Sequence, residues 1–172
     1  KNIVGNIRHD LKQAYEKLIE VKGLSISDNE NGKWLMDYLS DISRIDRESD
    51  MFRYPFGNNL KVLFDRQTNI SLVATHDNMN KAFSIIKGIY DTGDILEQEI
   101  EAYEPHLIIE GGHYYQQSVV GYKYSQHAFY PYYSSYEEVG NFLKGVIMAE
   151  KKANLFMPMC YLYRNAVELG LK

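Results

Sequence analysis

The spacing of apolar residues predicts amphipathic helices over most of the chain. In five segments apolar side chains recur every three or four positions, with polar residues between them. These segments are 2–22, 33–45, about 78–103, 135–152, and Pro158 to the end. Gly23 is placed to stop the first helix, and Glu104-Pro105 to stop the third. The pattern therefore predicts a mainly α fold, a helical bundle.

Two helices carry more detailed signals. Gly88 and Gly93 weaken the third helix and predict a bend or a break near 91–93. Ser135-x-x-Glu138 has the form of a capping box and predicts the start of the fourth helix. The predicted core face of the third helix consists of Met79, Phe83, Ile86, Tyr90, Leu96, Ile100 and Tyr103.

Residues 52–75 depart from the helical period. Pro55 excludes the interior of a helix, and Gly57-Asn58-Asn59 is typical of a turn. The runs 60–64 and 70–75 are short and β-prone. We therefore predict a small β hairpin inserted into the helical bundle.

The domain organisation follows from these elements. Residues 1–103 form a helical segment with the hairpin at about 52–75, and residues 104–172 combine a Tyr-rich stretch with two core helices. We expect one integrated domain, in which the helix at 2–22 packs against the last helix. Because the chain begins at Lys1 and ends inside a predicted helix, we expect a fragment or a processed chain.

Composition narrows the classes of function. The 172 residues carry a formal net charge of −4, which argues against broad nucleic-acid binding but leaves room for a local basic pocket. Cys160 is the single cysteine, so the chain forms no internal disulfide, and its apolar neighbours indicate a buried thiol. The longest apolar run is too short to span a bilayer and no secretory signal is present, so we expect a cytoplasmic protein without a membrane partner.

Tyrosine is concentrated in one stretch of the chain. Eight tyrosines lie between Tyr114 and Tyr136. Such rings can stack on bases, but no cluster of Arg and Lys accompanies them. Tyrosine also suits protein interfaces, because its ring buries area while its hydroxyl keeps a hydrogen bond. We predict that this segment makes a protein interface, with a homodimer as the first candidate.

The last helix holds the first candidate for chemistry. Between Ala153 and Leu171 the only charged residues are Arg164 and Glu168, four positions apart on one helix face. In one interpretation they form a structural ion pair, because a buried charge needs a partner. In the other, Arg164 binds an anion such as phosphate and Asn165 flanks it.

Two histidine-containing motifs are further candidates. His9, between Arg8 and Asp10, has the residue type for general acid–base work, although these three can also be surface residues at a helix start. His106, Glu110 and His113 would share one helix face as metal ligands, but the intervening Gly111-Gly112 argues against a helix. The sequence therefore predicts no metal site and no cofactor.

Three segments resemble the HEPN-like helical domains of bacterial defence and toxin–antitoxin proteins. They are Tyr163-Arg164-Asn165-Ala166-Val167-Glu168-Leu169-Gly170-Leu171-Lys172, His9-Asp10-Leu11-Lys12-Gln13-Ala14-Tyr15-Glu16-Lys17-Leu18, and Phe52-Arg53-Tyr54-Pro55-Phe56. The resemblance implies a helical bundle that dimerises. In the family the Tyr-Arg helix precedes the His-Asp helix, whereas here it comes last, which suggests a permuted or tandem arrangement.

The resemblance also implies a chemistry. Active members of the HEPN superfamily are metal-independent ribonucleases, in which one helix carries an Arg, a polar residue and, a few positions later, a His. Arg164 and Asn165 match the first half of this motif, but 169–171 hold Leu-Gly-Leu where the His is expected. This departure puts catalysis in question.

We therefore expect a HEPN-like domain of a defence or stress-response protein that binds RNA, a nucleotide or a partner protein. The alternative is a non-catalytic scaffold or regulatory module, and the third possibility is a ribonuclease that combines Arg164 with His9. The residues expected to bind are Asn165, Glu168, Arg8 and Arg53.

Overall fold

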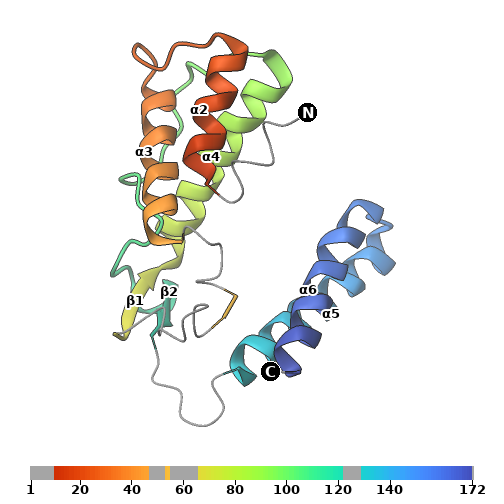
Figure 1. The fold of residues 1–172 in the computed structure, drawn as a ribbon. Coiled ribbons are helices and arrows are strands. Elements are labelled where there is room, and N and C mark those ends of the chain that lie inside the picture. Colours follow the sequence, from red (N-terminus) through yellow and green to blue (C-terminus); the bar gives the residue numbers. More distant parts are fainter. Residues whose placement is uncertain (1–9, 47–52, 55–65, 122–128, 172) are drawn as a thin grey trace. The chain divides into compact units, whose positions relative to one another are not determined.

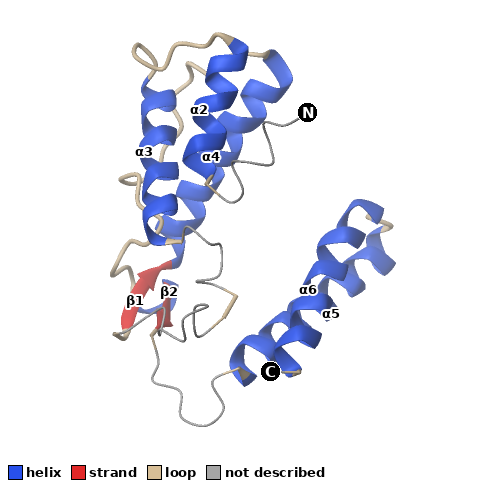
Figure 2. Ribbon diagram, in the orientation of Figure 1, coloured by secondary structure: helices blue, strands red, loops and turns tan. Residues whose placement is uncertain are grey.

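The computed structural model describes residues 10–46, 53–54, 66–121 and 129–171. This part of the chain contains five α-helices, two short 3-10 helices and one two-stranded antiparallel sheet (Figures 1 and 2). The mainly helical fold with a small sheet is thus confirmed. The chain divides into two compact units: unit 1 is Lys1–Ser49 with Arg66–Val120, and unit 2 is Asp50–Asp65 with Gly121–Lys172.

Unit 1 is built on three helices that lie side by side (Figure 1). The Asp10 carboxylate caps the first by accepting from the N–H of Gln13 at 3.0 Å. This helix ends at Gly23, whose φ of 66° is left-handed, so the predicted stop is confirmed. The three helices are α2 (Leu11–Lys22), α3 (Glu30–Ile45) and α4 (Leu72–Thr92).

The third helix differs from its prediction at both ends. It begins at Leu72, because the Ser71 hydroxyl accepts from the N–H of Ala74 and caps it. It ends at Thr92, and Gly93 turns the chain with a φ of 81°. A bend or a break was predicted near 91–93, and the helix does break there; its predicted continuation to Tyr103 is wrong.

After Gly93 the chain folds back as an extended strap, residues 94–109, along α3 and α4. Two buried asparagines fix it by bonding to its backbone. The Asn31 side-chain amide donates to the carbonyl of Leu96 at 2.7 Å, and that of Asn78 donates to the carbonyl of Glu104 at 2.8 Å. These bonds replace the helical hydrogen bonds expected for this stretch.

The core of unit 1 lies between the three helices and the strap. On α4 it is formed by small and aliphatic residues, and the face predicted from the sequence is wrong: Met79, Phe83, Ile86 and Tyr90 are 42–88% exposed. The helix carries two apolar stripes, and the one with Ala74, Ala82 and Gly88 packs inward because it allows close approach. The buried apolar residues of this core are Tyr15, Ile19, Leu35, Tyr38, Leu39, Ala82, Ile85, Ile89, Ile95 and Leu107.

The small sheet pairs distant segments. Strand β1 (Thr68–Ser71) runs antiparallel to β2 (Gln117–Val120), with Thr68 opposite Val120. The predicted strand 70–75 thus ends at Ser71, because that residue caps α4. The other predicted strand, 60–64, lies outside the described residues, and the described partner of β1 comes from the Tyr-rich stretch.

Unit 2 contains a helical hairpin, α5 (Tyr130–Glu150) and α6 (Phe156–Gly170), joined by the 3-10 turn Ala153–Leu155. The helices approach closely at Gly140, where a Cβ atom would lie 3.1 Å from the Tyr163 ring. The Tyr163 hydroxyl also donates to the Asn141 side chain at 2.8 Å. The predicted capping box is wrong: α5 begins five residues before Ser135, with Pro131 in its first turn, and the Ser135 hydroxyl donates to the Pro131 carbonyl.

Helices α2 and α6 belong to different units, so their sharing of one core and the single integrated domain stay predictions. The Tyr-rich stretch is also divided: Tyr114 and Tyr115 lie in unit 1, and Tyr130 lies in unit 2. Its role as an interface stays a prediction. None of the described helices is long and apolar enough to cross a membrane.

Candidate functional site

Helix α6 places Arg164 on the surface of unit 2. Arg164 is exposed, and no hydrogen bond or ion pair joins it to another described residue. The structural ion pair with Glu168 is therefore a wrong prediction. The Glu168 carboxylate instead accepts a hydrogen bond from the Tyr54 hydroxyl at 2.7 Å. With its carboxylate partner engaged elsewhere, the guanidinium of Arg164 can bind an anion.

The contact between Tyr54 and Glu168 joins segments 114 positions apart in the sequence. The Arg53 guanidinium carbon lies 5.4 Å from the centroid of the Tyr54 ring, at the distance of a cation–π contact. Tyr54 and Glu168 belong to two of the three segments that carry the family resemblance, and they are in contact in unit 2. Arg53 and Glu168 are both among the residues expected to bind, and each contacts Tyr54.

Further tyrosines surround this contact. Burial raises the pKa of Tyr136, the hydroxyls of Tyr161, Tyr54 and Tyr132 raise it further, and the Arg53 guanidinium opposes them. These influences place Tyr161, Arg53, Tyr54 and Tyr132 each near Tyr136. We call this set, with Glu168, the Tyr136 cluster: Arg53, Tyr54, Tyr132, Tyr136, Tyr161 and Glu168. Sequence reasoning missed the tyrosines of the cluster as a group: Tyr132 and Tyr136 lie in the Tyr-rich stretch, but Tyr54 and Tyr161 lie outside it.

The cluster continues onto the exposed face of α6. Tyr161, Arg164 and Glu168 are spaced three and four positions apart, which puts them on one side of the helix. Tyr161 is 48% exposed. This face offers an aromatic ring for stacking, a guanidinium for phosphate and a carboxylate held by a phenol.

Asn165 does not flank Arg164 as expected. It is 5% exposed, and its side-chain amide donates to the Tyr161 carbonyl one turn earlier at 2.9 Å. Successive residues on an α-helix are about 100° apart, so Asn165 turns inward while Arg164 faces outward. Its role is therefore structural.

His9 and Arg8 lie outside the described residues, so their predicted roles stay predictions. Their neighbour Asp10 caps α2 and also accepts from the Ser43 hydroxyl at 3.2 Å. This second bond ties the start of α2 to α3.

The three residues considered as metal ligands have separate partners. His106 Nδ1 lies 3.7 Å from Asp41, Glu110 pairs with Arg66 at 2.6 Å, and the His113 ring centroid lies 5.8 Å from that of Tyr115. Within the described ranges, no group of three or more His, Cys, Asp and Glu side chains has an arrangement suited to a metal ion.

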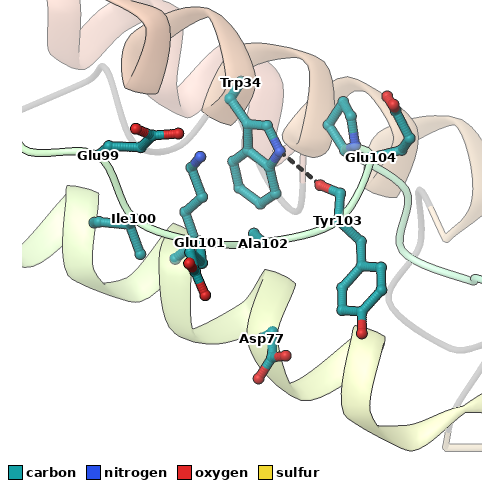
Figure 3. Close-up of a pocket in the computed structure, with 10 residues that line it drawn as sticks. Trp34, Asp77, Glu99, Ile100, Glu101, Ala102, Tyr103 and Glu104 are labelled. Atoms are coloured by element: carbon teal, nitrogen blue, oxygen red, sulfur yellow. Dashed lines mark hydrogen bonds between the residues drawn. The ribbon is translucent and has the colours of Figure 1, made fainter.

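Unit 1 contains a pocket of about 500 Å³ between α3, α4 and the strap (Figure 3). Trp34 forms one wall and donates from Nε1 to the Tyr103 carbonyl at 3.0 Å. The ammonium of Lys81 lies 4.9 Å from the Trp34 ring centroid. Burial lowers the pKa of Lys81, and Glu99 opposes this effect. Because a lysine of the chain already covers the ring, the pocket is a weaker candidate than unit 2.

The candidate site is therefore the Tyr136 cluster with Arg164. No protein-family model, no curated protein and no solved structure matches this chain.

Proposed function

We propose that the protein is a cytoplasmic HEPN-like domain of a bacterial defence or stress-response protein, and that unit 2 binds RNA. The observation that carries this proposal is the exposed Arg164, which has no ion pair among the described residues and shares a helix face with Tyr161 and Glu168. The contact of Tyr54 with Glu168 supports it, because it joins two segments that resemble the family.

Each group of the site has a role in this proposal. Arg164 donates to a phosphate through its planar fork, and Tyr161 stacks on a neighbouring base. Arg53 adds a second positive charge near the same ring cluster. Binding rests on these few groups and not on a broad basic surface, in keeping with the net charge of −4.

The test is the affinity of the full chain for a single-stranded RNA, measured by fluorescence anisotropy. Arg164→Ala is expected to weaken binding about tenfold or more, because a hydrogen bond to a charged group contributes about 1.5–3 kcal/mol. Lys144→Ala is the matched control, since it removes an exposed cation from the neighbouring helix α5. If both variants lose RNA affinity equally, or if Arg164→Ala loses none, the RNA site is not at Arg164.

Binding of RNA at this site does not by itself imply that the RNA is cleaved. The third possibility, a metal-independent ribonuclease, requires His9 to act with Arg164. RNA cleavage that persists with a metal chelator and disappears in His9→Ala would support it. Binding without cleavage supports the non-catalytic form of the proposal.

A partner-binding scaffold is the second candidate function. The observation in its favour is the exposure of apolar residues on α6 and at its C-terminal cap, where Met157 is 73%, Val167 62% and Leu171 84% exposed. A protein partner or a second copy would cover such side chains. Co-purification of a partner, together with an absence of RNA binding, would favour the scaffold.

A further inference from the structure

We infer that the exposed apolar stripe of α4 is a self-association surface, on which α4 of a second copy of this chain packs antiparallel. This inference concerns unit 1 and does not depend on the proposed RNA site. The stripe consists of Leu72, His76, Met79, Phe83, Ile86 and Tyr90. It is continuous over almost the whole length of α4.

The apolar members of the stripe are too exposed to belong to the core of unit 1. Phe83 is 65% and Tyr90 88% exposed, while Leu72, Met79 and Ile86 are 42–50% exposed. The core face of the same helix is centred on Asn78, Ile85 and Ile89. At about 100° per residue, the two faces are roughly 130° apart around the helix axis. The stripe therefore points away from the helices that α4 packs against in unit 1.

The spacing of the stripe fits a helix–helix seam. Its members are four and three positions apart in strict alternation, which is the heptad pattern of two packed helices. A long apolar seam of one helix is complementary to the same seam on a copy, and two-fold symmetry is the usual way in which identical chains pair. This regularity selects a helix as the occupant, and the copy of the chain supplies one.

The direction of pairing follows from the ends of the stripe. In the antiparallel arrangement the two-fold axis lies midway between Met79 and Phe83, so that Met79 faces Phe83 of the copy and His76 faces Ile86. A parallel arrangement would place His76 against His76 and align the two helix dipoles unfavourably. His76 already bonds to Asp77, with Nδ1 3.0 Å from the carboxylate. Antiparallel pairing leaves this bond at the edge of the seam.

The exposed apolar area of the stripe limits how tightly two copies can associate. Aromatic side chains offer about 150–250 Å² each, so the exposed parts of the stripe come to about 550 Å² per copy and about 1,100 Å² for the pair. Specific interfaces bury upward of about 1,200 Å², and smaller ones are transient. We therefore expect a dimer that dissociates in the micromolar range.

The first test is sedimentation of the full chain across micromolar concentrations. The wild type is expected to be a monomer–dimer mixture, and Phe83→Lys to weaken association by more than about tenfold. Tyr115→Lys is the matched control, because Tyr115 is 85% exposed on unit 1 and belongs to the competing Tyr-rich interface. Circular dichroism checks that each variant keeps its helices.

The second test is disulfide cross-linking in a Cys160→Ser background. Chains with Met79→Cys, mixed with chains with Phe83→Cys, are expected to cross-link under mild oxidation. Tyr90→Cys alone is expected not to cross-link, because its two positions would be about 27 Å apart along antiparallel helices. Cross-linking of Tyr90→Cys would overturn the antiparallel arrangement. A monomer throughout the concentration range, or a dimer disrupted by Tyr115→Lys and not by Phe83→Lys, would overturn the stripe as the self-association surface.

Discussion

At the scale of single residues, polar groups with fixed partners organise unit 1. Asp41 is 8% exposed, and its carboxylate accepts from the N–H of Leu107 at 2.9 Å and from the Arg44 guanidinium. It therefore anchors the strap on α3. Asn78, fully buried, does the same from α4. Neither bond follows from sequence spacing, because the partners are 66 and 26 positions away.

Because Asp41 anchors the strap through its carboxylate, the stability of the protein should depend on pH. Burial alone would raise the pKa of Asp41, but the Leu107 N–H, Arg44 and His106 outweigh it and lower the pKa. A lowered pKa in the folded state stabilises the fold above the unfolded pKa of about 3.9, and the contribution disappears as pH falls through the folded value. We expect Asp41→Asn to reduce the free energy of unfolding by about 1–2 kcal/mol at neutral pH and by less at about pH 3.

Urea unfolding at the two pH values measures this difference. Asp37→Asn is the control, because it removes an exposed carboxylate one turn earlier on α3. The difference in free energy of unfolding between the wild type and Asp41→Asn should be smaller in acid. If it is the same at both pH values, the charge of Asp41 has no role in anchoring the strap.

At the scale of elements, α4 depends on a close approach of the strap. A Cβ atom at Gly88 would lie 2.5 Å from Leu96 Cγ, so the strap fits only because Gly88 has no side chain. Ala is normally the better helix former by about 0.5–1 kcal/mol. Here we expect Gly88→Ala to destabilise the protein, because overpacking costs about 1–3 kcal/mol.

The double variant Gly88→Ala/Leu96→Ala separates the two effects. Removing the Leu96 branch makes room for the new methyl group, so Gly88→Ala should cost less in that background than in the wild type. Thermal denaturation of the four proteins in this cycle provides the measurement. A Gly88→Ala protein that melts higher than the wild type would contradict the close approach.

Local features of these elements could be predicted from the sequence, but contacts between distant segments could not. Local signals predicted the helix periods and the stop at Gly23, because capping and amphipathic spacing act within a few residues. They did not choose between the two apolar stripes of α4, since periodicity alone does not say which stripe packs. They also missed the pairing of β1 with β2 and the contact of Tyr54 with Glu168, which join distant segments. The sequence named Arg164, Glu168 and Arg53 as candidates, but it did not predict the contacts of Tyr54 with Arg53 and Glu168.

At the scale of the whole molecule, the two units differ in how much they bury. Among the described residues of unit 1, ten buried apolar side chains form the core, and Leu35 and Ile85 are fully enclosed. In the helical hairpin of unit 2, the buried residues are Gly140, Asn165, Ala166 and Leu169. Since stability comes mainly from buried apolar area, the units should differ in local stability.

Native-state hydrogen exchange on the full chain tests this difference. We expect the backbone amides of α3 and α4 near Leu35, Ile85 and Ile89 to exchange only by global unfolding. The amides of α5 and α6 should open at a lower free energy, because few apolar contacts must be broken to expose them. RNA that binds at Arg164 should raise protection in α6 and leave that of α3 unchanged, since ligand binding stabilises only the state that holds the site. Equal protection of all helices without RNA would contradict the separation in stability, and would mean that the apolar side chains of α5 and α6 are covered in solution.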